Sequence, residues 1–436
     1  MDAKTLEKHI ASSLPRQKNA LARFAYYDGK HPAIYSDAPK EAPDNRVPVP
    51  LPRKAVKEVM GYMFRSGDIS YAGSYYDSTL KPIFDGNEEA IVTPELAETA
   101  LIHGQAFELH WMEDGQHFAQ VPIAQCVPIY SDDLVPALEA FIRHWIDSDQ
   151  VAHAVSYDDS TITEWQYGKQ GWYIVSERAH GYKSVPVVEY TIARDKSNLF
   201  DHVLPLVDLL DQSISEDVAN ELQRFANAYL MMADDIDATT ADENGETELD
   251  KIKRTRVFAN LREDVTKKIA FLQKTIDPTF INTALDRTER LIYEMLCVPN
   301  PSDDVFNAQS GIALEYKLQP FEYLCSSIQT YFTRALQQRI RLIGNLDTTI
   351  NGDSGNVSDV EILWHRNKPD DVGSLADIAA KLKGVLSDET IVKLFPAWMV
   401  EDANEEMERL EAAKPDMTMD TPIEDTPEGA ADSEDE

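Results

Sequence analysis

Apolar residues that recur at three- and four-residue steps are the strongest pattern in the chain. Over residues 201–232 they form one stripe, which predicts a helix that could reach about 45 Å at 1.5 Å per residue. The stripe consists of Val203, Val207, Leu210, Ile214, Val218, Leu222, Phe225 and Tyr229. A helix of this kind needs a partner along its length, because its apolar stripe would otherwise face water.

A second amphipathic helix is predicted over residues 278–297. Its predicted apolar face carries Ile281, Leu285, Thr288, Ile292 and Met295, and its opposite face carries Thr279, Thr283, Asp286, Arg290 and Glu294. On the polar face Arg290 stands four residues from Asp286 and four from Glu294, so it largely cancels both carboxylates. We therefore expect a charged but nearly neutral surface along this side of the helix.

A third long helix is predicted from residue 311 to about residue 346, and Pro320 predicts a kink near its start because proline removes a backbone donor. A proline-broken acidic loop, residues 298–310, separates the second helix from the third. Pro299 and Pro301 end one helix and Ser310 precedes a glycine at the start of the next. The loop can therefore move while both helices stay anchored.

The remaining segments predict an α+β fold that is rich in helix. Helices are expected over about 4–27 and 53–65, and residues 88–190 mix a helix near 93–103 with short strands. Alternating patterns place these strands at 106–113, 117–123, 153–159, 160–168 and 171–177. Residues 233–275 form a compact insert, and a strand near 360–367 precedes a small helical module. The segment 415–436 holds no basic or aromatic residue, which predicts a disordered acidic tail.

The insert carries a basic cluster, Lys251, Lys253, Arg254 and Arg256, after an acidic tip. Two interpretations stay open for this cluster. It is either a solvated strand that balances the acidic tip or a surface that binds a partner.

Charge and composition narrow the classes of partner. Acidic residues outnumber basic ones 76 to 41 and the formal net charge is −35, which disfavours nonspecific wrapping of nucleic acid or adhesion to an anionic membrane. The amino terminus lacks the apolar core of a signal peptide, and no apolar run approaches the roughly 20 residues that span a bilayer. We expect a soluble protein made inside the cell, without a membrane partner.

Candidate chemistry is sparse. Isolated Cys126, Cys297 and Cys325 indicate neither a disulfide framework nor a zinc knuckle, and the sequence has no GxxxxGK[ST] loop and no GxSxG elbow. Three histidines recur every seven residues, namely His103, His110 and His117, and a metal site is the minor interpretation of them. Four acidic doublets lie in turn-like contexts, and a two-metal nuclease is the minor interpretation of these. The doublets are Asp132–Asp133, Asp158–Asp159, Asp234–Asp235 and Asp303–Asp304. We assign no catalytic residue, cofactor or metal.

Four stretches, together with the order of the elements, resemble the portal proteins of tailed double-stranded-DNA bacteriophages with long non-contractile tails. They are "YYDGKHP" at 26–32 with "GYMF" at 61–64, "HVLPLVDLLDQSISEDVANELQRFANAYL" at 202–230, "ALDRTERLIYEMLCVP" at 284–299 and "SGIALEYKL" at 310–318. With the element order the resemblance covers nearly the whole chain. It implies a channel protein and not an enzyme, with the packaging ATPase on another polypeptide.

The resemblance also implies a domain plan. Residues 1–200 would form the N-terminal part of an α+β wing, 201–232 and 276–297 two stem helices, 233–275 a small α/β clip and 298–310 a tunnel loop. Residues 311–365 would form a long kinked wing helix and a strand, 366–414 a helical crown and 415–436 the tail.

In that plan twelve subunits form a ring at one capsid vertex of the virion, after assembly in the host cytoplasm. Double-stranded DNA passes through the ring during packaging and ejection, without sequence readout. The implied protein partners are the terminase large subunit, head-completion, adaptor or neck proteins that replace it, the major capsid protein and the scaffolding protein.

Site residues follow from the same plan. The polar face Thr279–Thr283–Asp286–Arg290–Glu294 would line the channel, where cancelling charges let DNA slide past. The basic cluster of the clip would form a belt that docks a partner. The tunnel loop would narrow the channel with Asp303, Asp304, Val305, Phe306 and Asn307, although without the resemblance a plain connector is the simpler interpretation of this loop.

Two other classes of protein stay open on the residues alone. The chain could be an intracellular enzyme with an acidic carboxylate or metal site, or an assembly scaffold without a channel. Electron micrographs of the purified protein separate these, since only the portal interpretation predicts rings with a central hole.

Overall fold

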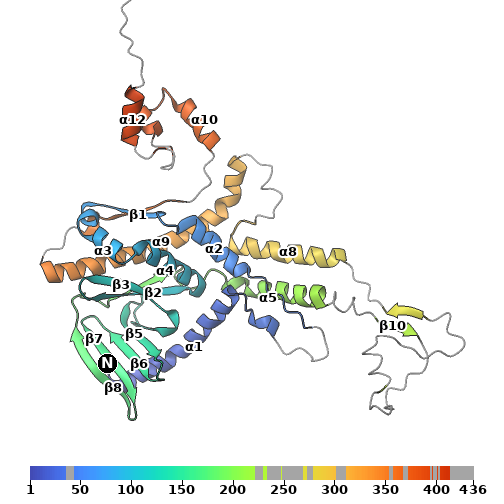
Figure 1. The fold of residues 1–436 in the computed structure, drawn as a ribbon, viewed down its shortest axis with the longest axis horizontal. Helices are drawn as coiled ribbons and strands as arrows, with labels where there is room; N and C mark the ends of the chain where they lie inside the picture. The colour runs from blue at the N-terminus through green and yellow to red at the C-terminus, as the bar shows by residue number, and fades with distance from the viewer. Residues whose placement is uncertain are drawn as a thin grey trace, which may run out of the picture. The chain divides into compact units, whose positions relative to one another are not determined.

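The computed structural model describes residues 1–35, 44–220, 229–232, 247, 269–272, 278–300, 311–352, 357–366, 372–392, 395, 400 and 403–412. The chain divides into two compact units, residues 1–367 and residues 368–436 (Figure 1). The first unit is α+β, as expected from the sequence. No helix among the described residues is long and apolar enough to cross a bilayer.

The N-terminal helices begin and end close to the predicted positions. They are α1 (Ala3–Tyr27), α2 (Leu51–Met63) and α4 (Glu89–His103). The Asp2 side chain caps α1 by accepting a hydrogen bond from the Thr5 amide at 2.8 Å. At the end of α4, Gly104 has φ +82°, and a Cβ there would lie 2.1 Å from the carbonyl oxygen of Lys196, so the close approach of these two segments requires glycine.

Short elements that the sequence did not predict join α2 to α4. They are β1 (Ile69–Ala72), the π-helix η2 (Tyr76–Leu80) and α3 (Lys81–Gly86). A 3-10 turn, η1 (Pro32–Tyr35), follows α1. Strand β1 pairs antiparallel with β12 (Glu361–Trp364), the strand predicted near 360–367. The end of the first unit therefore returns to its N-terminal part.

Most of the described strands of the first unit lie in two antiparallel sheets. The three-stranded sheet has the order β3-β2-β9, and the five-stranded sheet has the order β4-β5-β6-β7-β8. Their strands are β2 (Gln105–Met112), β3 (Gln116–Val121), β4 (Cys126–Tyr130), β5 (Leu138–Ile146), β6 (Ala152–Tyr157), β7 (Thr161–Gly168), β8 (Gly171–Ala179) and β9 (Val187–Thr191). The alternating patterns predicted β2, β3, β6, β7 and β8.

Strand β5 was missed because it is buried on both faces. Phe141 packs with Phe107 toward the three-stranded sheet, whereas the next residue, Ile142, packs with Leu6 of α1 on the opposite face. A strand covered on both sides does not show the alternation that marks a half-buried strand. The five-stranded sheet thus lies between α1 and the three-stranded sheet.

The first long helix is shorter than predicted. Helix α5 (Leu204–Ser213) follows a 3-10 turn, η4 (Asp201–Val203), and continues as a π-helix, η5 (Ile214–Asn220). The prediction of one helix through Tyr229 is wrong, because β10 (Tyr229–Met232) is a strand that pairs antiparallel with β11 (Ile269–Leu272). A short apolar run is compatible with helix or strand, and pairing with β11 decides between them.

The other two long helices match their predictions. They are α8 (Pro278–Leu296) and α9 (Gly311–Asn351), which runs about one turn beyond the predicted end. Figure 1 shows α9 bending in its N-terminal part, the part that contains Pro320.

The largest core cluster draws buried side chains from helices α1, α2, α4, α5, α8 and α9 and from strands β2 and β9. Among them are Tyr26 of α1, Val56 of α2, Leu96 of α4, Tyr190 of β9, Val207 of α5, Ile292 of α8 and Phe332 of α9. Helices α5, α8 and α9 are therefore fixed to the same core as the three-stranded sheet.

The second unit contains three helices among its described residues, as the helical module at 366–414 predicted. They are α10 (Val372–Leu382), α11 (Asp388–Val392) and α12 (Ala403–Ala412). Arg409 pairs with Glu405 at 2.9 Å across one turn of α12.

Candidate functional site

Helix α8 carries the predicted site residues that the structure describes, and it packs against α5. Ile292, Tyr293 and Leu296 are buried in the cluster that also holds Val207 and Leu210 of α5. The helix is held at its C-terminal end by polar contacts as well. Lys54 of α2 donates to the Tyr293 hydroxyl at 2.6 Å and also lies over its ring.

The five residues predicted for the polar face of α8 are all exposed. At about 100° per residue they lie opposite Ile292, the centre of the buried face. Asp286 and Glu294 flank Arg290, yet neither carboxylate lies within ion-pair distance of the guanidinium. The charges offset one another through proximity along the helix and not through direct contact, and they leave one net negative charge on this face.

One residue of the predicted apolar face is misplaced. Met295 is 52% exposed, whereas Leu296, which the prediction left out, is 2% exposed. The cause is the position of α5, which covers the side of α8 that is centred on Ile292 and turned toward Leu296. Periodicity alone does not say where a partner helix will lie.

As a result, α8 carries a largely exposed apolar stripe between its buried face and its polar face. Phe280 is 72% exposed, Met295 is 52% exposed and Leu291 is half-buried. These three positions lie within about 60° of one another on the helix surface. We refer to Phe280, Leu291 and Met295 as the flank stripe of α8.

An extended segment holds α5 in place beside α8. Every second backbone amide of this segment donates to a buried side-chain oxygen on the helix or its π-helical extension. These bonds run from the Val49 amide to Asp211 at 2.8 Å, from Val47 to Ser215 at 3.0 Å and from Asn45 to Asn220 at 2.8 Å. Two residues of extended chain cover nearly the same distance as four residues of α-helix, which is the step from Asp211 to Ser215. The next step, from Ser215 to Asn220, is five residues long and lies in the π-helix η5.

Asp211 has a second buried partner, which ties the end of α1 to α5. His31 and Asp211 are both fully buried, and the His31 Nδ1 atom contacts the Asp211 carboxylate. The other ring nitrogen of His31 lies 2.9 Å from the carbonyl oxygen of Tyr26. Sequence inspection did not find this pair, because the two residues are far apart in the chain.

A buried ionic cluster anchors α9, and it too was missed. The fully buried Arg339 bonds Glu108 of β2, with its Nε atom 3.0 Å from one carboxylate oxygen and 3.1 Å from the other. It also donates to Thr93 at 2.8 Å and to Glu89 at 3.1 Å, both on α4. One arginine therefore joins a helix, a strand and a second helix.

The protonation of Glu108 follows from this environment. Burial alone raises the pKa of the carboxyl, but the charge of Arg339 and the hydrogen bond from His110 outweigh it and lower the pKa to about 2. His110 lies 2.7 Å from Glu108. The only sequence signal was the pair of polar residues, Glu108 and His110, on one side of a mostly apolar strand.

The three histidines at seven-residue spacing do not converge. His103 ends α4, His110 contacts Glu108, and His117 lies 2.8 Å from the carbonyl oxygen of Glu113. Within the described part of the chain no group of three His, Cys, Asp or Glu could hold a metal ion. Burial raises the thiol pKa of Cys126 and of Cys325 to about 12, which keeps both protonated.

Other predicted residues lie outside the described residues. These are the clip cluster Lys251, Lys253, Arg254 and Arg256, the tunnel-loop residues Asp303, Asp304, Val305, Phe306 and Asn307, the doublet Asp234–Asp235 and the tail at 415–436. Of the two doublets that the structure describes, Asp158–Asp159 lies in a turn where Asp158 accepts from the Thr161 amide at 2.6 Å. That carboxylate shapes the turn between β6 and β7.

Comparison with known proteins adds a relationship that covers nearly the whole chain. Residues 6–417 match the family described as phage portal protein, SPP1 Gp6-like. The chain is also 21% identical to the portal protein of Clostridium phage phiCD119 over 452 aligned positions, which cover 94% of this chain and 95% of that protein. The chain belongs to the phage portal proteins of the SPP1 Gp6-like family.

Proposed function

We propose that twelve copies of this chain form a ring at one vertex of the phage capsid and that double-stranded DNA passes through its centre. Membership of the portal family supports this role. The observation that carries the proposal is the three-sided surface of α8: one face is buried on α5, one is polar and exposed, and the flank stripe between them is apolar and largely exposed.

A ring gives each side of α8 a partner. The flank stripe would pack against the stem helices of the neighbouring subunit, which removes Phe280, Leu291 and Met295 from water. The polar face, which lies beside the stripe, would then line the central channel. A heterologous contact of this kind closes into a ring when a full turn is a whole multiple of the rotation between neighbouring subunits.

The charge pattern of the proposed channel wall suits sliding. A firm contact to each phosphate would add affinity through counterion release and would slow the movement of DNA. Arg290 is flanked by Asp286 and Glu294 at one-turn spacing, so the face keeps only one net negative charge per subunit and offers phosphates no net attraction. The exposed threonines at 279 and 283 add hydroxyl groups without charge.

Other parts of the chain would complete the portal. Residues 233–275 would form a clip whose basic cluster docks the terminase large subunit and later a head-completion or neck protein. Residues 298–310 would form the collar that narrows the channel, and the outer surface would meet the major capsid and scaffolding proteins. The family is a structural class without catalysis of its own, so ATP hydrolysis would reside in the terminase.

Ring formation is tested by placing charge in the flank stripe. The double variant Leu291→Asp, Met295→Asp should remain folded but fail to assemble, because burying two carboxylates at each subunit contact is costly. The control variant Thr279→Asp, Thr283→Asp adds the same charge to the polar face and should still assemble. Mass photometry should report about 590 kDa, twelve times the 49.1 kDa chain, for wild type and control. Rings that persist in the flank-stripe variant would refute the assigned contact.

A further inference from the structure

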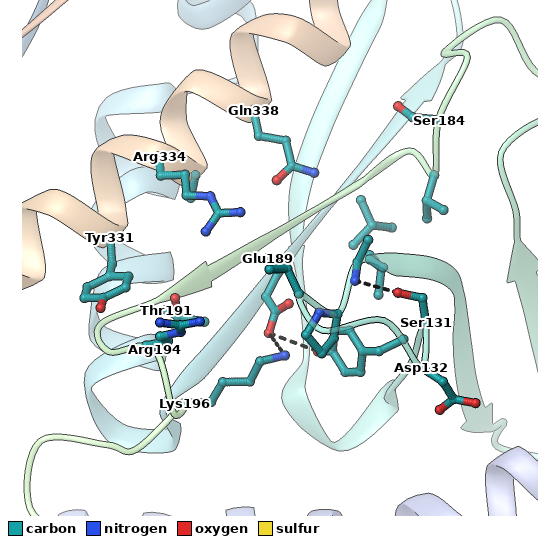
Figure 2. Close-up of a pocket in the computed structure, with 18 residues that line it drawn as sticks. Ser131, Asp132, Ser184, Glu189, Thr191, Arg194, Lys196, Tyr331, Arg334 and Gln338 are labelled. Carbon is teal, nitrogen blue, oxygen red and sulfur yellow. Dashed lines mark hydrogen bonds and ion pairs between the residues drawn. The ribbon is translucent and has the colours of Figure 1, made fainter.

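A hollow of about 680 Å³ lies in the first unit, between the sheets and α9. It is bounded by β9, by the end of β4 with the loop that follows it, and by α9 (Figure 2). Arg334 and Gln338 point into this space from α9, and Glu189 of β9 lies across from them with Lys196. The proposed passage of DNA through the ring assigns no role to this hollow.

The hollow is basic in a strongly acidic chain. The carboxylate of Glu189 is already occupied, since it lies 2.9 Å from the Lys196 Nζ atom and accepts from the Tyr130 hydroxyl at 2.9 Å. Arg194 and Arg334 are exposed, and neither forms an ion pair with any other described residue. Asp132, the other carboxylate of the lining, is exposed at the rim and is turned away from the centre (Figure 2).

Part of the lining is apolar, and the hollow lies beside two strands that are outermost in their sheets. Val135, which is 61% exposed, and Pro136 form one rim, and Leu134, which precedes them in the loop, is 98% exposed. In their own sheets β9 and β4 are both outermost strands. An outermost strand presents backbone groups that can pair with an added extended chain.

We propose that this hollow binds an extended acidic peptide segment of a partner protein. Carboxylates of the peptide would meet Arg194 and Arg334, whose planar guanidinium groups suit carboxylate oxygens. An apolar side chain next to them would cover Val135 and Pro136. A DNA backbone fits less well, because it offers no apolar group for this rim and the net charge of −35 repels it.

This binding site is separate from the proposed channel and does not require a ring, so the two proposals can be tested independently. The test measures fluorescence anisotropy of a labelled, end-blocked peptide in which glutamates stand next to valines, titrated with the full-length protein. A second peptide with glutamine at each glutamate controls for charge, and a short DNA duplex serves as the competitor.

The arginine pair is tested with a charge-matched control. Arg194→Ser with Arg334→Ser should weaken binding of the glutamate peptide by about tenfold for each arginine removed. Lys169→Ser with Arg178→Ser removes two exposed charges near the opposite edge of the five-stranded sheet and should leave binding unchanged.

Four outcomes would overturn the proposal. They are an absence of saturable binding by the glutamate peptide, equal binding of the glutamine peptide, equal effects of the two double variants, and a DNA duplex that binds through the same arginines more tightly than the peptide.

Discussion

Two arginines of the first unit, Arg339 and Arg290, are each matched with two carboxylates and serve opposite purposes. Arg339 is fully buried and bonds Glu108 and Glu89 directly, whereas Arg290 is exposed and lies one helical turn from Asp286 and from Glu294 without touching either. The buried arrangement fixes α9 to α4 and β2. The exposed arrangement fixes nothing and keeps one surface of α8 close to neutral.

The difference shows how position decides what an ion pair does. In the interior, removing one partner leaves an uncompensated charge, so the cluster behaves as a rigid joint. On the surface water screens both partners, and the pair contributes little to stability. Substitutions at Arg339 should therefore act on folding, and substitutions at Arg290 should act on the transport of DNA.

The largest expected effect is that of Arg339→Met. This change leaves the fully buried Glu108 without its cation, which should lower the free energy of unfolding by about 3–5 kcal/mol. Urea denaturation followed by tryptophan fluorescence measures the loss. Arg334→Met, an exposed position on the same helix, should change stability by no more than about 0.5 kcal/mol. Equal midpoints for the two variants would contradict the anchoring role of Arg339.

The second effect is a pH dependence of that same cluster. Because the folded-state pKa of Glu108 is lowered to about 2, its contribution to stability is fully present above the ordinary carboxyl pKa of 4.5 and is lost as the pH falls toward 2. The stability difference between wild type and Arg339→Met should therefore shrink over this range. Urea denaturation of both proteins at pH values between 6 and 3, in steps of about one pH unit, measures how this stability difference changes. A difference that stays constant with pH would show that Glu108 is not the carboxylate held by Arg339.

The smallest effect on stability, and a large one on function, is expected for Arg290→Glu. The exposed change should leave the unfolding midpoint within about 0.5 kcal/mol of wild type. In the proposed ring it would leave an acidic band within a Debye length, about 8–10 Å, of the phosphates. DNA packaging in vitro should slow, most at low salt, while Arg290→Lys, which keeps the charge, should package as wild type does. Slowing that is independent of salt would argue against an electrostatic wall.

The sequence predicted those features that depend on neighbours along the chain. The boundaries of α8 and the exposure of Asp286, Arg290 and Glu294 follow from a 3.6-residue period, and β7 follows from alternation. The features it missed depend on partners far along the chain. Arg339 and Glu108 are 231 residues apart, and Tyr229 is a strand residue because it pairs with Leu272.

The site shows the same division. The polar face of α8 could be predicted, but the exposure of Met295 depends on where α5 lies, and no local pattern contains that information. The basic hollow joins the end of β4, the segment after β9 and the middle of α9, so it exists only in the folded chain. The clip cluster and the tunnel loop stay predictions from the resemblance to portal proteins.

The central claim, that α8 lines a channel, is tested most directly by a cryo-electron microscopy reconstruction of the purified oligomer. We predict a twelve-fold ring in which Arg290 faces the central axis and Leu291 and Met295 contact the neighbouring subunit. A ring in which Arg290 is buried between subunits, or particles without a central channel, would contradict the account.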